Sequence, residues 1–273
     1  MKNLLQRTTS GIVYLMLVTG ALVLGEFAYA FVFLILGLLS LHEFYRISAA
    51  AGGKPLILPG LIAGGTVFLI SFGTASGLFS SAVWFTVPVL VIALFVIVMF
   101  SGSPDIFRNL GITMLGLVYI IIPLCTMNYL VFQTSGTTEY THRIVLGILI
   151  LVWINDTGAY LAGITLGRHK LLPRISPKKS WEGAIGGTVM TLLASFWLSS
   201  IMGILDTMNW MVLALIVSVF GVLGDLVESM FKRSADVKDS GSLLPGHGGI
   251  LDRIDSILFV MPVSLAYLSV FLG

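Results

Sequence analysis

Between Lys54 and Asp105 the chain carries no charged residue, and this stretch is too long for one membrane crossing. A transmembrane helix needs about 20 apolar residues to cross about 30 Å of hydrocarbon. The polar segment 71–81 therefore divides the stretch into two spans. Of the 273 residues, 57% are hydrophobic and 10% are charged. This composition excludes an ordinary soluble domain and a disordered chain, because too little polar surface exists to cover a globule.

Dividing the whole chain at its charged residues, Gly/Pro clusters and polar loops predicts an all-α polytopic membrane protein with about nine transmembrane helices. The predicted spans lie near residues 10–25, 27–44, 57–72, 82–100, 109–131, 144–166, 183–203, 208–231 and 251–271. With a cytoplasmic N-terminus, 14 of the 15 Lys and Arg residues lie in cytoplasmic segments, and only Arg143 lies outside. This excess of Lys and Arg in cytoplasmic segments is what the positive-inside rule predicts, and it supports the assigned orientation. A cleaved signal peptide ending near Ala30 is the alternative for the first span, and Glu26 disfavours it.

Most charged residues follow position 140, which predicts two parts with different roles. Residues 1–140 supply about five N-terminal spans, and residues 141–273 supply about four catalytic spans with cytoplasmic loops. The net charge of +2 predicts no nucleic-acid partner. The single cysteine, Cys125, cannot form an internal disulfide and is expected to pack as a small hydrophobic residue.

Carboxylates inside the C-terminal spans predict a polar cavity that faces the cytoplasm. Asp156 lies midway along a span, where a carboxylate costs at least about 2.5–3.5 kcal/mol, so it either pairs with another group or lines a cavity. Asp225 and Glu228 share a helix face with Lys232, although Glu228 and Lys232 alone are explained by an i,i+4 ion pair. Asp225 and Asp252 together supply oxygen ligands of the kind that Mg²⁺ takes with substrate phosphates.

The start of the last span combines acidic residues with glycines. The macrodipole alone favours an acid such as Asp255 in the first turn of a helix, so a role as metal ligand and a purely structural role both stay open. Gly248 and Gly249 permit close backbone approach, and N–H groups at a helix start form an anion site. His247 either contacts phosphate or holds the turn.

A second predicted phosphate site precedes the span near 183–203. Lys178 and Lys179 lie between Pro177 and the expected helix N-cap Ser180. Cationic side chains beside a helix N-terminus suit a polyphosphate. The positive-inside rule explains the other basic residues of this loop without any further role.

The residues from Ser229 to Asp255 resemble, without a gap, the signature of the CDP-diacylglycerol synthases, also called phosphatidate cytidylyltransferases. The matching run reads Ser229-x-Phe231-Lys232-Arg233, then Lys238-Asp239-x-Gly241, then Leu244-Pro245-x-His247-Gly248-Gly249-Ile250-x-Asp252-Arg253-Ile254-Asp255. The segments NDTGAY (155–160), SPKKSWEG (176–183) and GDLVES (224–229) look like family segments in family order. The resemblance is detailed over about residues 140–256. Ser180 stands where many relatives carry Thr, which keeps the hydroxyl.

The resemblance implies transfer of the cytidylyl group of CTP to phosphatidic acid, giving CDP-diacylglycerol and pyrophosphate, with Mg²⁺ as one ion or with a second cation. It implies an enzyme of the bacterial inner membrane whose active site faces the cytoplasm; the sequence leaves a homodimer open. The expected catalytic residues are Asp225, Lys232, Arg233, Asp252 and Arg253. The expected substrate-binding residues are Lys178, Lys179, Ser180, Lys238, Asp239, His247, Gly248 and Gly249. The expected metal ligands are Asp225, Asp252 and Asp255.

Two other classes of protein fit some of the same residues. A CTP-dependent lipid-alcohol kinase uses similar carboxylates and basic loops, but it phosphorylates a hydroxyl group and releases CDP. A transporter or channel would explain the intramembrane carboxylates Asp156 and Asp225 as an ion path. Against a transporter, the sequence has no visible inverted repeat of the kind found in many transporter folds.

Overall fold

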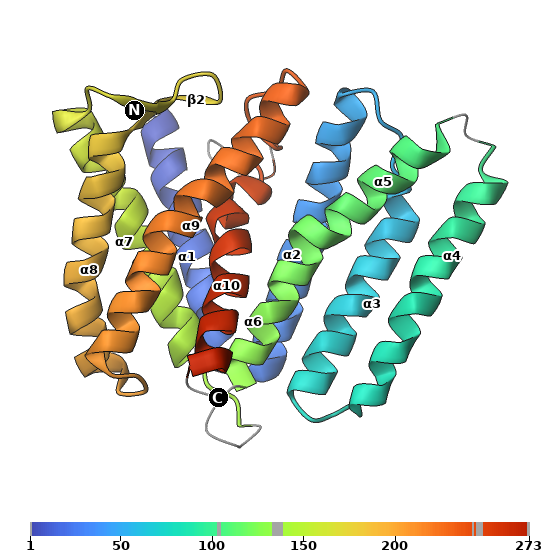
Figure 1. Ribbon diagram of the computed structural model, residues 1–273, viewed down its shortest axis with the longest axis horizontal. Coiled ribbons are helices and arrows are strands. Elements are labelled where there is room, and N and C mark those ends of the chain that lie inside the picture. Colours follow the sequence, from blue (N-terminus) through green and yellow to red (C-terminus); the bar gives the residue numbers. More distant parts are fainter. Residues whose placement is uncertain (1, 103–104, 133–138, 242, 244–247, 272–273) are drawn as a thin grey trace. The chain divides into compact units, whose positions relative to one another are not determined.

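The computed structural model describes residues 2–102, 105–132, 139–241, 243 and 248–271, in which helices joined by turns and loops are accompanied by one short β-hairpin (Figure 1). Eight helical spans in this part of the chain are long and apolar enough to cross a membrane. The first helix, α1 (Lys2–Leu24), adds a shorter apolar stretch, Thr9–Leu24. The predicted all-α polytopic membrane fold is thereby confirmed.

The remaining helices follow in chain order. They are α2 (Glu26–Ala50), α3 (Ile57–Ala75), α4 (Thr86–Phe100), α5 (Ile106–Gly116), α6 (Ile122–Phe132), α7 (Arg143–Leu166), α8 (Trp181–Met202), α9 (Thr207–Ser234) and α10 (Leu251–Phe271). A 3₁₀ turn, Ser81–Phe85, precedes α4, and a π-helical turn, Leu117–Ile121, joins α5 to α6. As predicted, a polar break after Ala75 separates the two spans of the long uncharged stretch.

The chain folds into two compact units that are not contiguous in sequence. Unit 1 comprises Met1–Tyr140 and Ser234–Arg253, and unit 2 comprises Thr141–Arg233 and Ile254–Gly273. The segment Ser234–Arg253, which carries much of the signature, therefore packs with the N-terminal helices.

Buried polar side chains join the helices of unit 1. The Tyr29 hydroxyl on α2 donates to Asn128 Oδ1 on α6 (2.9 Å), and Asn128 Nδ2 donates to Ser71 Oγ on α3 (2.9 Å). These bonds satisfy groups that would be costly to leave unpaired away from water. Outside the spans, burial raises the pKa of Tyr140, and its protonated hydroxyl donates to the Leu22 carbonyl (2.7 Å). Cys125 is buried and free, as expected.

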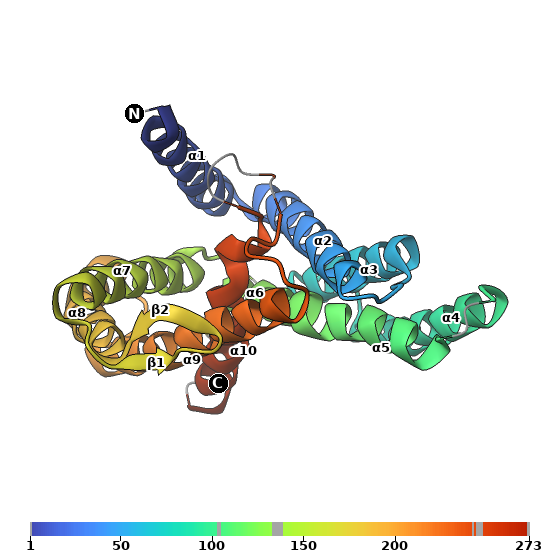
Figure 2. The same cartoon turned by 90° about the horizontal axis from the view of Figure 1, so that it is seen from above.

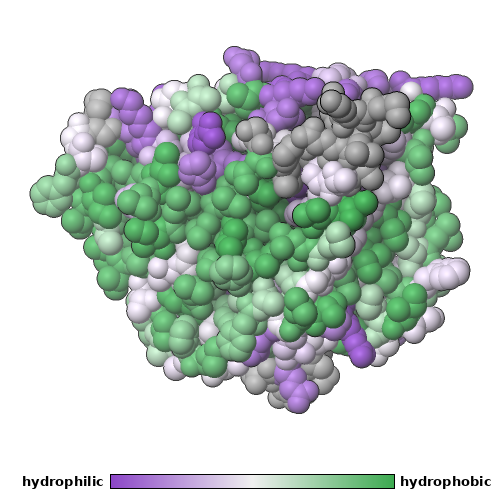
Figure 3. Space-filling model, turned by 180° about the vertical axis from the view of Figure 1, so that it is seen from behind, coloured by the Kyte–Doolittle hydropathy of each residue, from purple (hydrophilic) through white to green (hydrophobic). Residues whose placement is uncertain are grey.

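Small residues let α7 and α8 pack closely in unit 2, where the two helices lie side by side (Figures 1 and 2). A Cβ atom on Gly187 would lie 2.8 Å from the Asn155 carbonyl oxygen, and one on Gly183 would lie 2.8 Å from the Ala159 carbonyl oxygen. These glycines therefore serve packing within the chain, a role that the sequence alone could not separate from packing between chains. Large apolar residues cover much of the face in Figure 3, as expected for a surface against lipid.

Candidate active site

A β-hairpin between α7 and α8 carries the basic segment that was expected to be a loop. Strand β1 (Lys170–Leu172) pairs antiparallel with β2 (Ser176–Ser180), which leads directly into α8. The Glu182 carboxylate accepts hydrogen bonds from the N–H groups of Arg168 and His169 at 3.1 Å. One acid at the start of α8 thus fixes the chain where it leaves α7.

Ser180 is the N-cap of α8, as its position predicts. Its Oγ accepts a hydrogen bond from the N–H of Gly183 (3.1 Å), and the residue is buried. An N-cap side chain satisfies one of the N–H groups that a helix start leaves unpaired. The substrate-binding role predicted for Ser180 stays a prediction.

Lys179 forms an ion pair with Asp225 on α9. Lys179 Nζ lies 2.6 Å from Asp225 Oδ2, and the Ser229 hydroxyl donates to Asp225 Oδ1 (3.2 Å). Both charged side chains keep contact with solvent, with exposed fractions of 26% and 35%. Of the predicted residues, the structure brings these two together although they lie far apart in sequence.

This ion pair lies in the wall of a cavity of about 530 Å³ within unit 2. That volume is within the usual range of about 300–1,000 Å³ for small-molecule sites. Polar and charged side chains share the lining with apolar ones such as Ile164 and Val222. The charged members are Asp156, Lys170, Lys178, Lys179 and Asp225. Asp156 therefore lines a cavity, one of the two roles predicted for it.

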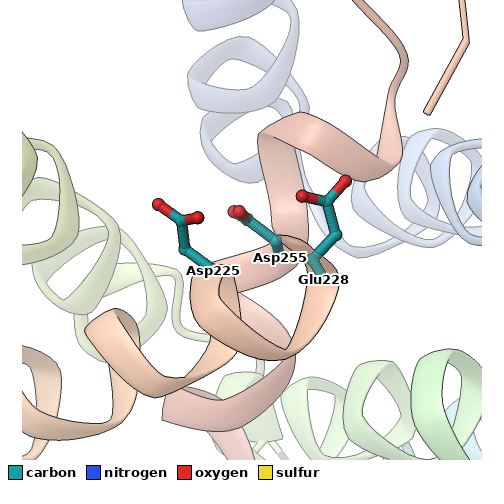
Figure 4. A group of neighbouring side chains, drawn as sticks. All are labelled: Asp225, Glu228 and Asp255. Atoms are coloured by element: carbon teal, nitrogen blue, oxygen red, sulfur yellow. The ribbon is translucent and has the colours of Figure 1, made fainter. Parts of the chain in front are cut away.

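Asp225 is one of three carboxylates from α9 and α10 that lie close together. One oxygen each of Asp225, Glu228 and Asp255 lies within 4.8 Å of the others, and the three side chains point to the same side in Figure 4. Asp225 and Asp255 were predicted as metal ligands, while Glu228 was not. Carboxylate oxygens at this separation are a donor set that suits a divalent cation such as Mg²⁺.

Lys232 pairs with Glu228 one turn earlier on α9, which is the i,i+4 pair that the sequence left open. The Glu228 side chain is 1% exposed and the Lys232 side chain is 11% exposed. Removing one partner of a buried ion pair strongly destabilises the folded protein, because the other charge is left buried without its partner. Lys232 therefore has a structural role here beside the catalytic role that was predicted for it.

The other predicted acids and glycines belong to unit 1. Asp252 Oδ2 accepts hydrogen bonds from the N–H groups of Ser240 (3.0 Å) and Gly249 (2.8 Å). Gly248 has a positive φ of 85°, and a Cβ atom there would lie 2.4 Å from Asp252 Oδ2.

The remaining predicted site residues fall into three groups. Arg233, Lys238 and Asp239 are exposed, and Arg253 is half-buried. Asp255 lies in unit 2, with the carboxylates described above. His247 lies outside the described residues.

One functional candidate, Glu43, is absent from the predicted site. It ends the second predicted span beside residues that serve as ordinary interfacial anchors, so its local sequence gives only a weak signal of function. The structure buries its carboxylate against Ser240 and the start of α10, about 200 residues later in the chain. No spacing of neighbouring residues in the sequence indicates a contact between segments so far apart.

Comparison with known proteins identifies the family of the chain. The sequence model of the Cytidylyltransferase family matches residues 5–271. Phosphatidate cytidylyltransferase of Bacillus subtilis is 33% identical over 280 positions, which cover 99% of this chain and 100% of that protein. The enzyme of the same name from Staphylococcus epidermidis is 34% identical, covering 94% and 96%. The Staphylococcus aureus enzyme is 52% identical over 135 positions, covering 48% and 51%. The chain therefore belongs to the cytidylyltransferase family.

Proposed function

We propose that the protein transfers the cytidylyl group of CTP to phosphatidic acid, giving CDP-diacylglycerol and pyrophosphate. The observation that carries this proposal is the cavity of unit 2, where Lys179 meets Asp225 beside a group of carboxylates. The relatives named phosphatidate cytidylyltransferase support the choice of nucleotide and lipid. We place the site on the cytoplasmic side of a bacterial inner membrane, where CTP is available.

In this reaction an oxygen of the lipid phosphate forms a bond with the α-phosphorus of CTP. The bond between the α-phosphorus and the oxygen that bridges to the β-phosphate breaks, and pyrophosphate leaves with that electron pair. The lipid is a phosphate monoester with a second pKa of about 6, so it is already ionised near neutral pH. The protein therefore needs no general base, and its task is to hold two polyanions together.

The cationic side chains of the cavity perform this task. Lys178 and Lys179 project from the hairpin into the cavity and neutralise phosphate charge as the two substrates approach. The apolar lining, including Ile164 and Val222, suits the acyl chains of the lipid. One cavity wall thus offers both kinds of surface that an amphipathic substrate requires.

The cluster of three carboxylates is suited to a divalent cation. Asp225 and Asp255 are the proposed Mg²⁺ ligands, with Glu228 beside them, because their oxygens already converge and Asp225 already binds a cationic group, Lys179. Bound Mg²⁺ supplies charge neutralisation for the transferring and departing phosphates. Asp252, in unit 1, stays a predicted ligand.

The proposed function is tested with detergent-purified protein, phosphatidic acid, Mg²⁺ and CTP that carries a radioactive label at the α- or the γ-phosphate. We expect the α label to enter the lipid and the γ label to leave as pyrophosphate. Transfer of the γ label to an added lipid alcohol, with release of CDP, would identify a kinase instead. If no label enters any lipid, ion flux in liposomes without CTP becomes the decisive assay.

Replacement of Lys179 by Gln is expected to lower kcat/KM for CTP at least tenfold. A hydrogen bond to a charged group contributes about 1.5–3 kcal/mol, and each 1.4 kcal/mol corresponds to a factor of ten. The measurement is initial rate against CTP concentration. The matched control is Arg174→Gln on the same hairpin, because Arg174 is exposed and does not line the cavity. Equal losses in both variants would contradict a specific role for Lys179.

A further inference from the structure

The carboxylate of Glu43 is buried at the C-terminal end of α2, where the residue is 2% exposed. A carboxylate removed from water needs hydrogen-bond donors to offset the lost hydration. Glu43 Oε1 accepts from the N–H of Ile250 (3.1 Å), and Oε2 accepts from the N–H of Leu251 (2.9 Å) and from Ser240 Oγ (3.0 Å). All of these residues belong to unit 1. A side chain of an N-terminal helix is thus hydrogen-bonded to the segment that carries the family signature.

These bonds make Glu43 a helix cap supplied from another part of the chain. The first N–H groups of a helix have no partner within the helix, and most helices satisfy them with a residue close in sequence. At the start of α10, Glu43 accepts from Ile250 and Leu251, and Asp252 accepts from Gly249 (2.8 Å). At this helix start, where the sequence predicts a phosphate site, the N–H groups thus donate to the protein's own carboxylates.

Ser240 connects Glu43 to Asp252. Its Oγ lies 3.0 Å from both Glu43 Oε2 and Asp252 Oδ2, and its backbone N–H also donates to Asp252 Oδ2 (3.0 Å). A hydroxyl has a single hydrogen, so it donates to one of the two carboxylates at a time. A shift of Glu43 therefore alters the donors that fix Asp252.

Two glycines of the signature are explained by the same carboxylate. A Cβ atom on Gly241 would lie 2.4 Å from Glu43 Oε1, and one on Gly249 would lie 2.3 Å from Glu43 Oε2. Any larger residue at either position would push the carboxylate away from its donors. Glycine at these two positions therefore leaves room for the contact between the Glu43 carboxylate and its hydrogen-bond donors.

We propose that Glu43 is a positioning residue for Asp252, a predicted metal ligand: it holds Ser240 and the start of α10 so that Asp252 keeps its place. This rests on the proposed function, for which Asp252 stays a predicted metal ligand. Partners that orient a metal-binding group typically change metal affinity or activity by about 10–100-fold when they are mutated. Glu43 makes no contact with the reacting atoms in this role.

The test compares Glu43→Gln with Glu26→Gln, the same change in the first turn of the same helix. Gln keeps the size of Glu but replaces one accepting oxygen with an NH₂ group that cannot accept. We expect Glu43→Gln to lower kcat/KM at least tenfold and to raise the half-saturating Mg²⁺ concentration. Independently of activity, trypsin should cut after the exposed Lys238 at least several times faster. Glu26→Gln should match the wild type in all three measurements.

Gly241→Ala is the second variant, because it displaces the Glu43 carboxylate without changing its charge. If both residues act through one contact, the double variant with Glu43→Gln should lose little more activity than the worse single variant. Unchanged cleavage in a folded Glu43→Gln protein would overturn the proposal, and so would faster cleavage with unchanged kcat/KM. If the wild type transfers no cytidylyl group, the proposed function fails, and the cleavage rates alone then decide whether Glu43 orders the segment.

Discussion

Asp225→Asn is expected to reduce cytidylyl transfer by about a thousandfold while the protein stays folded. This is the upper end of the loss that follows removal of one electrostatic contact in an active site. Asn keeps the size of Asp but removes the charge that binds Lys179 and one of the three converging carboxylates. Mg²⁺ depends on such carboxylates, so the loss affects metal binding as well as the position of Lys179.

The measurement is turnover of labelled CTP at saturating Mg²⁺, together with a thermal unfolding curve in detergent. Asp206→Asn is the matched control, since Asp206 caps the other end of α9 by accepting from the N–H of Asn209 (2.9 Å). Asn also serves well as an N-cap, so this variant should retain at least half of the activity. A folded Asp225→Asn protein with near-normal turnover would remove Asp225 from the metal role.

The fold could be predicted from the sequence because its cause is local. Each span is a run of apolar residues bounded by charges or polar turns. Lipid offers no hydrogen-bond partners, so such a run forms a helix, in which its backbone N–H and C=O groups bond to one another. The same regularity placed Asp225 and Glu228 on one helix face, since residues three apart are neighbours on a helix. The hairpin of 170–180 was missed because its strands are short and one contains Pro177, which disfavours a strand.

The assembly of the site could not be predicted in the same way, because it depends on contacts between distant segments. Lys179 and Asp225 each stood out as candidates, but no spacing rule pairs a residue on a hairpin with one on a later helix. Glu43 illustrates the limit most clearly. The helix start that it caps was predicted to bind phosphate, and no feature of the sequence indicated that its N–H groups donate to Glu43.

Gly224→Ala is expected to lower activity by about a hundredfold, because Gly224 sets the distance between α9 and α10 next to Asp225. A Cβ atom at Gly224 would lie 2.5 Å from the Asp255 carbonyl oxygen and 3.1 Å from Ser256 Cα. Both are backbone atoms, so no side chain can rotate away, and the helices must separate. Overpacking of this kind typically costs about 1–3 kcal/mol of stability. A misplacement of about 1 Å in an active site can cost a hundredfold in rate.

Gly221→Ala provides the control one turn earlier on the same helix. Its Cβ atom would lie 3.8 Å from the nearest atoms, on Ser256 and Val260, which is an ordinary contact. Because Ala favours a helix over Gly by about 1 kcal/mol, Gly221→Ala should be as stable as the wild type or more so, with unchanged turnover. Unfolding temperature and kcat measured for both variants separate the two positions. Similar activity in both would mean that the spacing of α9 and α10 does not control the carboxylates, whereas a loss confined to Gly224→Ala would tie catalysis to that one backbone contact.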